Sequence, residues 1–492
     1  MKAAWTGGRV FGKRIFLLFF AVGMMFLSAC STNPATGDNQ FTALLPASQE
    51  ASVGAQEHQK VQQTFGDFVD GPVADYVSRI GNKIAAHTER KDVQYKFFVI
   101  DSPVVNAFAL PGGYIYVSRG LLALANSEAE VAGVLGHEIG HITARHAAER
   151  VSQGALVGLG AAILSAAVGD PGVSRAAGLG SELYIKSYSR GQESQADELG
   201  VRYISRSGYD TMAMAGFLNS LDQDSKLEQK ISGQKESRFN YFSTHPVTHD
   251  RVVQAAAEAQ KYAPGKGVQG HETHLNAING LIYGDSADQG FVRGQSFYHP
   301  KLGFTFSVPD GFDIHNSPQQ VVATHSASKT IILFDAAGDK QKRDPLTYLT
   351  QGWLGGKEVS SPENVTINGF RAGTAAFSGT VQGRPVTIRA VAIEWKPGQY
   401  FRFQMAIPTG TSASIVEGLK KTTYSFRRLR DSEKNISPAR IRVVTADPGQ
   451  GVSSLAGRMA FRDYREERFR VLNGLKAGES LVAGRQYKIV VE

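Results

Sequence analysis

The stretch VLGHEIGHITARH, which runs from Val134 to His146, contains three histidines and one glutamate. His137 and His141 stand at positions i and i+4, so on a helix both imidazoles project from one face and can share a cation. Glu138 directly follows His137, close enough to hold a water without being a ligand. This H-E-x-x-H arrangement is typical of a zinc site whose glutamate is the general base. The stretch therefore predicts a helix with two zinc ligands, and the third must come from elsewhere.

The helix that carries this stretch is expected to be long. Ser127 and Glu130 form a capping-box pattern, which predicts that the helix begins there and runs to about Arg150. His146 lies nine residues past His137. At about 100° per residue, a continuous helix would place it on the far side from the ligands. We therefore expect His146 to lie outside the site, as a surface or outer-layer residue.

Three glycines in the same helix, Gly133, Gly136 and Gly140, lower its intrinsic stability by about 1 kcal/mol each. Glycine so close to a site usually permits tight packing. We expect a strand or a substrate to lie across this part of the helix.

The third ligand is predicted to be Glu193, in the segment SRGQESQAD. A glutamate from a second helix completes the His₂Glu ligand set of some zinc enzymes. Asp197 follows Glu193 at i+4 on the same face, where it can accept a hydrogen bond from a ligand imidazole and fix its tautomer. Glu182 and Glu198 lack this spacing and are weaker candidates. A solvated helix face is the alternative reading of Glu193.

Residues of about 50 to 260 resemble the zinc metallopeptidase family of the CaaX prenyl proteases, HtpX and BepA-like periplasmic lipoproteins. The resemblance rests on four motifs in family order: NAFALPGG (Asn106–Gly113), HEIGH, SR-x-x-E-x-x-x-D (Ser189–Asp197) and THP-x-x-x-x-R (Thr244–Arg251). It implies a mainly helical, gluzincin-type domain with a small sheet and one Zn²⁺ per chain. The transmembrane helices of the membrane members have no counterpart in the sequence, so the match is to the secreted branch.

The resemblance also implies roles for further residues. Asn106, Ala107, Phe108 and Ala109 match an edge strand that binds an extended substrate through its backbone. His245 and Arg251 match residues that face the metal and stabilise the oxyanion, and in BepA-like members the histidine can cap the zinc. From its chemistry alone, His245 before a proline is only a candidate, and an ordinary turn residue is the alternative.

The N-terminus predicts export and a lipid anchor. Four basic residues precede a 13-residue apolar core, Ile15–Leu27, which suits a signal peptide and is short for a membrane span. Leu27-Ser28-Ala29-Cys30 resembles a lipobox, which implies cleavage before Cys30 and its lipidation. Ser31 then implies sorting to the outer membrane, on its periplasmic side. Cleavage lowers the formal net charge from +8 to +4, too little to argue for a nucleic-acid partner.

The rest of the chain predicts a multidomain α+β protein, and Gly154–Gly169 reads as a buried helix or a flap. The expected parts are a signal peptide (1–29), a polar tether (30–49), the metallopeptidase domain (50–262), a linker (263–289), a mainly β domain of unknown role (290–428), a second linker (429–439) and a small C-terminal unit (440–492). That unit resembles a βααβ LysM module, which implies peptidoglycan binding. Gln450-Gly451 departs from the family's Asp-Thr, so a packing module without a ligand remains the alternative.

Two hypotheses of function follow. The first is a lipid-anchored zinc endopeptidase that hydrolyses misfolded or misassembled envelope proteins, a task of protein quality control, with Glu138 as base. The second is a chaperone or a peptidoglycan-tethered scaffold whose metal site is capped and has little protease activity. The complete set of Glu138, both histidines, Glu193 and Asp197 favours the first, because an idle site has no physical need for a base.

Overall fold

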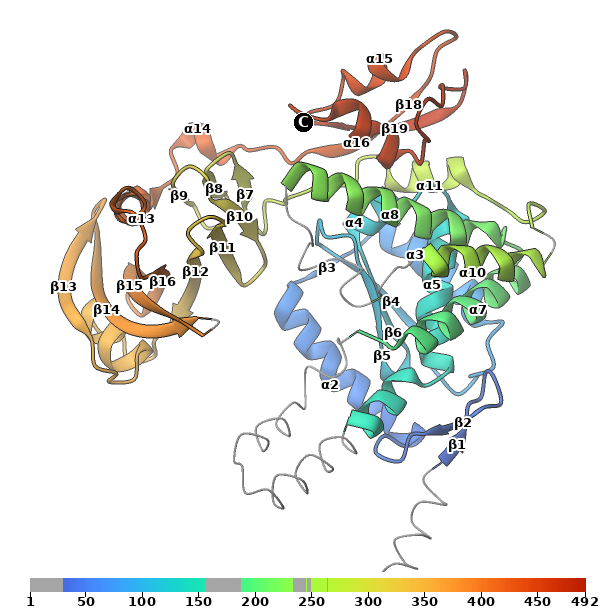
Figure 1. Cartoon of the computed structure of the whole chain (residues 1–492), viewed down its shortest axis with the longest axis horizontal. Helices are drawn as coiled ribbons and strands as arrows, with labels where there is room; N and C mark the ends of the chain where they lie inside the picture. The colour runs from blue at the N-terminus through green and yellow to red at the C-terminus, as the bar shows by residue number, and fades with distance from the viewer. Residues whose placement is uncertain (1–29, 155–186, 233–244, 246–248, 263, 382) are drawn as a thin grey trace, which may run out of the picture. The chain divides into compact units, whose positions relative to one another are not determined.

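The computed structural model describes residues 30–154, 187–232, 245, 249–262, 264–381 and 383–492 (Figure 1). The predicted signal peptide, and the apolar segment from residue 155 onward, lie outside these residues. The chain divides into two compact units: the first comprises residues 1–63, 67–281 and 441–491, and the second consists mainly of residues 282–440. The first unit holds all the motifs of the predicted metal site.

The described chain begins with a folded hairpin, where we expected a tether. Strands β1 (Cys30–Thr32) and β2 (Asn39–Phe41) pair antiparallel. Asn33 is only 3% exposed and donates from Nδ2 to the carbonyl oxygen of Ala144 at 3.3 Å. Leu45, the last residue of this hairpin segment (residues 30–45), is also buried. Residues 30–45 are polar in composition, yet they fold because their polar groups find partners in the first unit.

A small mixed sheet supports the first unit. Its strand order is β3-β4-β6-β5, and β4 and β6 run parallel while the other pairs are antiparallel. The strands are β3 (Phe68–Val69), β4 (Lys96–Ile100), β5 (Ala107–Leu110) and β6 (Tyr114–Ser118). Strands β4 (KFFVI) and β6 (YIYVS) are rich in aromatic and β-branched residues, which favour strands. A short 3₁₀ turn, η1 (Pro111–Gly113), joins β5 to β6.

Helices make up most of the first unit (Figure 1). They are α2 (Ala47–Phe65), α3 (Pro72–Ala85), α4 (Arg119–Leu124), α5 (Glu128–Thr143), α7 (Arg190–Arg206), α8 (Met212–Ser232), α10 (His249–Gln260) and α11 (His271–Ile278). Helix α5 contacts α3, α7 and α8, and it also contacts the edge strand β5. Helix α11 lies inside residues 263–289, a segment that we expected to be a linker.

Helix α5 starts as predicted and ends earlier. The Ser127 side chain accepts a hydrogen bond from the Glu130 backbone N–H at 3.1 Å, which caps the helix. The helix ends at Thr143 rather than near Arg150, because Arg145 adopts a left-handed conformation with φ 56°. Its buried side chain donates to Glu50 at 2.8 Å and to the Leu45 carbonyl at 2.7 Å. These contacts offset the cost of a left-handed residue, about 1–2 kcal/mol.

The C-terminal unit (residues 440–492), nearly all of which belongs to the first unit, has the expected β-α-α-β order. It packs against the helices of that unit. Its elements are β18 (Arg440–Thr445), α15 (Val452–Ala456), α16 (Arg465–Leu472) and β19 (Gln486–Val491). Lys488 of β19 is 0% exposed and donates to the carbonyl oxygens of Ala123, Leu124 and Ala125 at 2.7, 3.2 and 2.6 Å. One lysine thus caps the C-terminal end of α4, whose last carbonyls have no partner within the helix.

The second unit is mainly β, as the composition of residues 290–428 predicts. A seven-stranded antiparallel sheet has the order β10-β11-β12-β16-β15-β14-β13, and a four-stranded sheet the order β17-β9-β8-β7. The strands are β7 (Phe291–Arg293), β8 (Ser296–His299), β9 (Phe304–Ser307), β10 (Asp313–Asn316), β11 (Gln320–His325), β12 (Thr330–Gly338), β13 (Ser360–Ile367), β14 (Phe370–Val381), β15 (Arg384–Lys396), β16 (Gln399–Pro408) and β17 (Arg427–Arg428). Helix α13 (Ala413–Ser425) accompanies them, with short helical turns α12 (Pro345–Thr347), η4 (Tyr348–Trp353) and α14 (Asp431–Lys434).

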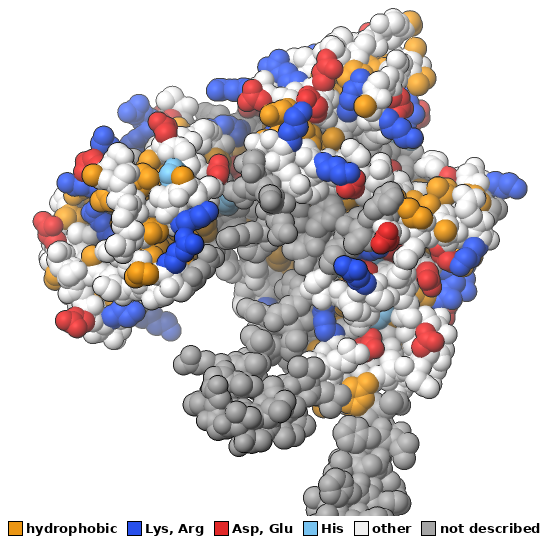
Figure 2. Space-filling view, viewed as in Figure 1, with side chains coloured by type: hydrophobic (Ala, Val, Ile, Leu, Met, Phe, Trp, Pro, Cys, Tyr) orange, Lys and Arg blue, Asp and Glu red, His pale blue; other side chains and the backbone are white. Residues whose placement is uncertain are grey.

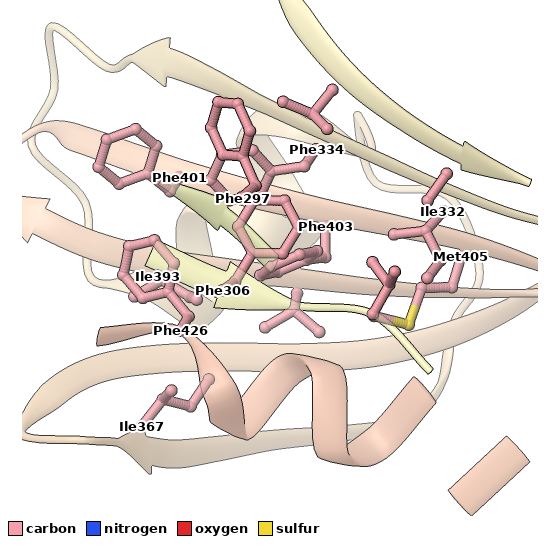
Figure 3. Packing of buried hydrophobic residues seen from close by; sticks show 14 of the residues in the cluster. Phe297, Phe306, Ile332, Phe334, Ile367, Ile393, Phe401, Phe403, Met405 and Phe426 are labelled. Carbon is pink, nitrogen blue, oxygen red and sulfur yellow. The ribbon is translucent and has the colours of Figure 1, made fainter. Parts of the chain in front are cut away.

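The core of the second unit is aromatic. Figure 3 shows Phe306, Phe334 and Phe403 packed together between the strands. The ring centroids of Phe306 and Phe334 lie 4.5 Å apart, and those of Phe334 and Phe403 lie 4.7 Å apart. Such contacts add to the free energy gained from burial alone.

Charged side chains of both signs are interspersed over the described part of the face drawn in Figure 2. This distribution accords with the small net charge expected of the cleaved chain. Among the described residues, none of the helices combines the length and the hydropathy needed to span a bilayer.

Candidate metal centre

The site is built on α5, whose motif residues are buried. His137, Glu138 and His141 are 1%, 0% and 2% exposed. Both imidazoles project from the same side of the helix, and their Nε2 atoms lie 3.0 Å apart. Each is therefore positioned by local helix geometry, as the i, i+4 spacing predicts.

Helix α7 crosses α5 at its glycines. A Cβ atom on Gly136 would lie 3.1 Å from the Gly200 carbonyl oxygen, and one on Gly140 would lie 3.0 Å from the Ala196 carbonyl oxygen. We expected a strand or a substrate at these glycines; the structure places a second helix there instead. Because the two backbones approach so closely, Glu193 at the start of α7 reaches the histidines of α5.

Four side chains bring donor atoms together at this crossing: His137, His141, Glu193 and His245, with their donor atoms all within 4.8 Å of one another. Glu193 Oε2 lies 3.6 Å from His137 Nε2, and Glu193 Oε1 lies 3.5 Å from His141 Nε2. Two donors bound tetrahedrally to zinc, each about 2.0–2.1 Å from the metal, lie about 3.3 Å apart. The observed separations fit that spacing.

His245 is the fourth member of this group. Its Nδ1 lies 2.9 Å from Glu193 Oε1 and 3.3 Å from His137 Nε2, and its Nε2 lies 3.5 Å from Glu138 Oε1. His245 thus stands between the predicted ligands and the predicted base. A tetrahedral zinc site with four protein donors is closed, whereas a catalytic site keeps one position open.

Both carboxylates of α7 are held ionised by their surroundings. Burial alone would raise the pKa of Glu193, but the charge of His245 and its close contact with Glu193 hold that pKa well below its usual range. Asp197 Oδ1 lies 2.8 Å from His137 Nδ1. Burial likewise opposes ionisation of Asp197, while bonds from His137 and Arg251 keep its pKa below the ordinary value. The site therefore presents negative charge to a cation.

Arg251 bonds to the same two carboxylates. Its guanidinium donates to Asp197 from Nε and Nη2, both at 2.8 Å, and its Nη1 lies 2.7 Å from Glu193 Oε2. Through these contacts Arg251 fixes the positions of the Glu193 and Asp197 carboxylates relative to each other. The expected role of Arg251 at an oxyanion stays a prediction.

Glu138 differs from the other acids of the site. Within the described part of the chain, neither of its carboxylate oxygens accepts a hydrogen bond. Burial raises the pKa of Glu138 above its ordinary value, against the opposing effect of His245 and His137. A carboxylate destabilised in this way takes up a proton readily, which suits a general base.

His146 is not at the surface on the far side of the helix; it takes the other expected position, in the layer behind the ligands. Its Nδ1 lies 2.8 Å from Nδ1 of His141, and it is 1% exposed. The helix rule placed it wrongly because α5 ends at Thr143 and Arg145 turns the chain back. Tyr188 was missed; its ring stacks on His141 with centroids 3.8 Å apart. Neither residue has a spacing signal in the sequence.

The expected substrate strand lies beside α5. Ala107, Phe108 and Ala109 belong to β5, the last strand of its sheet, and their side chains are buried. Asn106 precedes the strand, and its backbone N–H donates to Ser118 Oγ at 3.0 Å. β5 is thus an edge strand that contacts the helix of the metal centre; substrate binding there remains a prediction.

Comparison with known proteins settles the family. The model of peptidase family M48 matches residues 73–259. The metalloprotease LoiP of Escherichia coli is 30% identical over 214 residues, which cover 41% of this chain and 79% of LoiP. This chain belongs to peptidase family M48. The M48 domain contains every predicted ligand, and the family together with the buried donor group supports zinc as the cofactor.

Other relatives of the M48 domain include the beta-barrel assembly-enhancing protease of Yersinia pestis, 28% identical over 269 residues, which cover 49% of this chain and 54% of that protein. A mitochondrial metalloendopeptidase of Schizosaccharomyces pombe is 29% identical over 206 residues, covering 41% of this chain and 59% of that protein. The chain thus spans about half the length of the assembly-enhancing proteases it matches.

Proposed function

We propose that this protein is a zinc-dependent endopeptidase of the bacterial envelope that hydrolyses misfolded or misassembled envelope proteins. The observation that carries the proposal is the convergence of His137, His141 and Glu193 beside the buried, unbonded carboxylate of Glu138. The names of the relatives support the compartment and the class of substrate, since one of them is a beta-barrel assembly-enhancing protease.

The residues divide the chemistry among them. His137, His141 and Glu193 would hold zinc, which supplies an activated water and polarises the scissile carbonyl. Glu138 accepts the proton of the attacking water and returns it to the leaving amine. Asp197 and Arg251 keep the ligand side chains oriented through the bonds described above. An extended substrate would pair with the backbone of Asn106–Ala109.

His245 must move for this reaction to proceed, because its Nδ1 lies among the zinc donors. We infer a capped resting state in which His245 would be a fourth donor to the zinc held by His137, His141 and Glu193. When His245 leaves, a water can enter, and both His245 and Arg251 can then stabilise the developing oxyanion. Capping also favours the second candidate function, a lipid-anchored chaperone or scaffold with little protease activity.

Cleavage of an unfolded polypeptide separates the two candidates. We would compare the unsubstituted chain with Glu138→Gln and His245→Ala, each with its zinc content measured. An endopeptidase should lose at least about 100-fold in activity in Glu138→Gln at unchanged zinc content, and His245→Ala should cleave faster than the unsubstituted chain. Equal cleavage by Glu138→Gln would overturn the mechanism. Zinc-loaded chains that never cleave would favour the chaperone.

The anchoring of the protein is a separate proposal. Lipidation of Cys30 would attach the folded hairpin of residues 30–45 to the periplasmic face of the outer membrane, with no flexible tether between lipid and M48 domain. Labelling with radioactive palmitate should mark the chain and fail in Cys30→Ser. A chain that reaches the periplasm without label would contradict the anchor.

Peptidoglycan is a proposed partner of the C-terminal unit. Its β-α-α-β order supports a LysM-like module, while its buried contacts with α4 equally suit packing alone. Sedimentation of the full chain with purified peptidoglycan sacculi distinguishes the two. If the chain stays in the supernatant, the module does not bind peptidoglycan and only packs against the rest of the first unit.

A further inference from the structure

The outer side of His141 begins a chain of polar contacts that reaches the N-terminal hairpin. His141 Nδ1 lies 2.8 Å from His146 Nδ1, and His146 Nε2 lies 2.8 Å from Gln195 Oε1. Gln195 Oε1 also accepts from Asn33 Nδ2, and Gln195 Nε2 donates to Asp38 Oδ2, both at 3.4 Å. The Nδ1 atom of His137 bonds to Asp197 instead. Of the two ligand histidines, only His141 is therefore linked to this chain of contacts.

The positions of the protons follow from these contacts. The Gln195 oxygen faces two groups that can donate, and its amide faces a carboxylate that can only accept, so its orientation is set. His146 Nε2 must then carry the proton that it gives to Gln195. Because a neutral imidazole has one N–H, His146 Nδ1 is an acceptor, and His141 Nδ1 donates to it. The lone pair of His141 Nε2 is left facing the metal.

We propose that His146 and Gln195 are positioning residues that fix the tautomer of His141 for zinc, and that the hairpin of residues 30–45 belongs to the metal site through Gln195. The inference rests on the metal centre of the proposed function and adds to it an outer layer on the second histidine. Metal-bound imidazoles are usually oriented by such a partner, and its loss lowers metal affinity about 10–100-fold.

The conformation of Arg145 explains why His146 lies next to His141. Arg145 takes a left-handed conformation, and its guanidinium bonds to Glu50 and, in the hairpin segment, to Thr42 Oγ1 at 3.1 Å. This reversal brings the residue after it back toward α5. The hairpin segment thus has two roles. It bonds to Arg145, the residue whose conformation places His146, and it orients the Gln195 amide.

Metal affinity tests the proposal without reference to cleavage. We would titrate the purified, metal-free chain with Co²⁺, a zinc substitute with a visible spectrum, in competition with a chelator. His146→Phe keeps a ring of similar size but offers no acceptor, and it should weaken Co²⁺ binding about 10–100-fold. His146→Asn can place its side-chain oxygen where Nδ1 stood and should restore affinity to within about 3-fold. His146→Phe with unchanged affinity and spectrum would overturn the proposal.

A second pair of variants tests the direction of the protons. Gln195→Lys offers His146 only a donor, so His146 and then His141 must adopt the opposite tautomer, with a proton on Nε2 facing the metal. Its Co²⁺ affinity should fall at least about 10-fold. Gln195→Glu keeps an acceptor and should bind nearly as well as the unsubstituted chain. Equal affinities in the two variants would overturn the tautomer assignment.

Matched controls separate this role from charge and folding. Gln229 is exposed and lies on α8, a helix that carries none of the residues of the metal centre. Gln229→Lys therefore makes the same substitution, with the same added charge, outside the contacts of His146 and should keep full affinity. Thermal unfolding of each metal-free variant identifies any that fail to fold. If Co²⁺ affinities behave as expected while Glu138→Gln cleaves normally, the proposed function fails and the His146 role stands.

Discussion

The Gly140 backbone of α5 approaches the Ala196 carbonyl of α7 so closely that a Cβ on Gly140 would lie 3.0 Å from that oxygen. This contact sets the distance between the helix with two histidine ligands and the helix with Glu193. The metal centre therefore depends on residues that touch no metal. Gly140 lowers the helix propensity of α5, but it allows α7 to approach closely enough to place Glu193.

Gly140→Ala should lower Co²⁺ affinity about 3- to 10-fold, since a displacement of a few tenths of an ångström would move Glu193 away from the histidines. Gly133→Ala is the matched control, because its Cβ would make an ordinary contact of 3.4 Å with Met214. That control should retain affinity and gain up to about 1 kcal/mol in stability from helix propensity. If both variants bind cobalt equally, the close crossing does not position the ligand.

Asp197→Ala should lower zinc affinity about 10–100-fold. It removes the acceptor of His137 Nδ1 and a partner of the Arg251 guanidinium, both of which are buried. Competition with a chelator measures the loss. Asp222→Ala, which removes a partly exposed carboxylate that pairs with Lys226 on α8, should change the affinity by less than about 2-fold. Equal losses in the two variants would count against a specific role.

Lys488→Met should destabilise the first unit by about 2 kcal/mol, because it removes the donor to the buried Ala123 carbonyl. The Leu124 and Ala125 carbonyls keep donors in Asn126 and His274. Urea unfolding of the full chain measures the change. Lys476→Met, which removes an exposed lysine of the same C-terminal unit, should lie within about 0.5 kcal/mol of the unsubstituted chain. A tolerant Lys488→Met would show that the C-terminal unit docks through other contacts.

Stability of the first unit should fall on mild acidification because of His274. Burial, with help from Lys488, lowers the pKa of this imidazole from 6.5 to about 3. The unfolded chain takes up a proton below pH 6.5, whereas the folded chain does not until about pH 3. The stabilisation is therefore complete above pH 6.5 and is lost as pH falls toward 3, by about 2 kcal/mol at pH 5.

The test compares urea unfolding at pH 7 and pH 5 in the unsubstituted chain and in His274→Gln. The neutral ring accepts from Tyr76 and donates to the Leu122 and Ala125 carbonyls. His274→Gln should be less stable at pH 7 and should lose about 2 kcal/mol of the pH dependence. His87→Gln changes an exposed histidine and should keep the full slope. An unchanged slope in His274→Gln would contradict this origin.

Local spacing was enough to predict the inner part of the site. His137 and His141 are four residues apart on one helix, as are Glu193 and Asp197 on another, so helix geometry alone aligns each pair. The Ser127 cap of α5 is equally local. The β character of residues 290–428 followed from composition and alternation.

Only the tertiary structure decided what surrounds those pairs. The end of α5 depends on the partners of Arg145, which are 95 residues away at Glu50 and 100 residues away at Leu45, and no local signal announces them. The same contacts turn a polar N-terminal segment into a folded hairpin and bring His146 back to His141. The sequence by itself determined which residues could bind a metal, because periodicity is a local property. Their outer partners were decided by the fold, because buried polar groups take whichever partners the packed chain brings within reach.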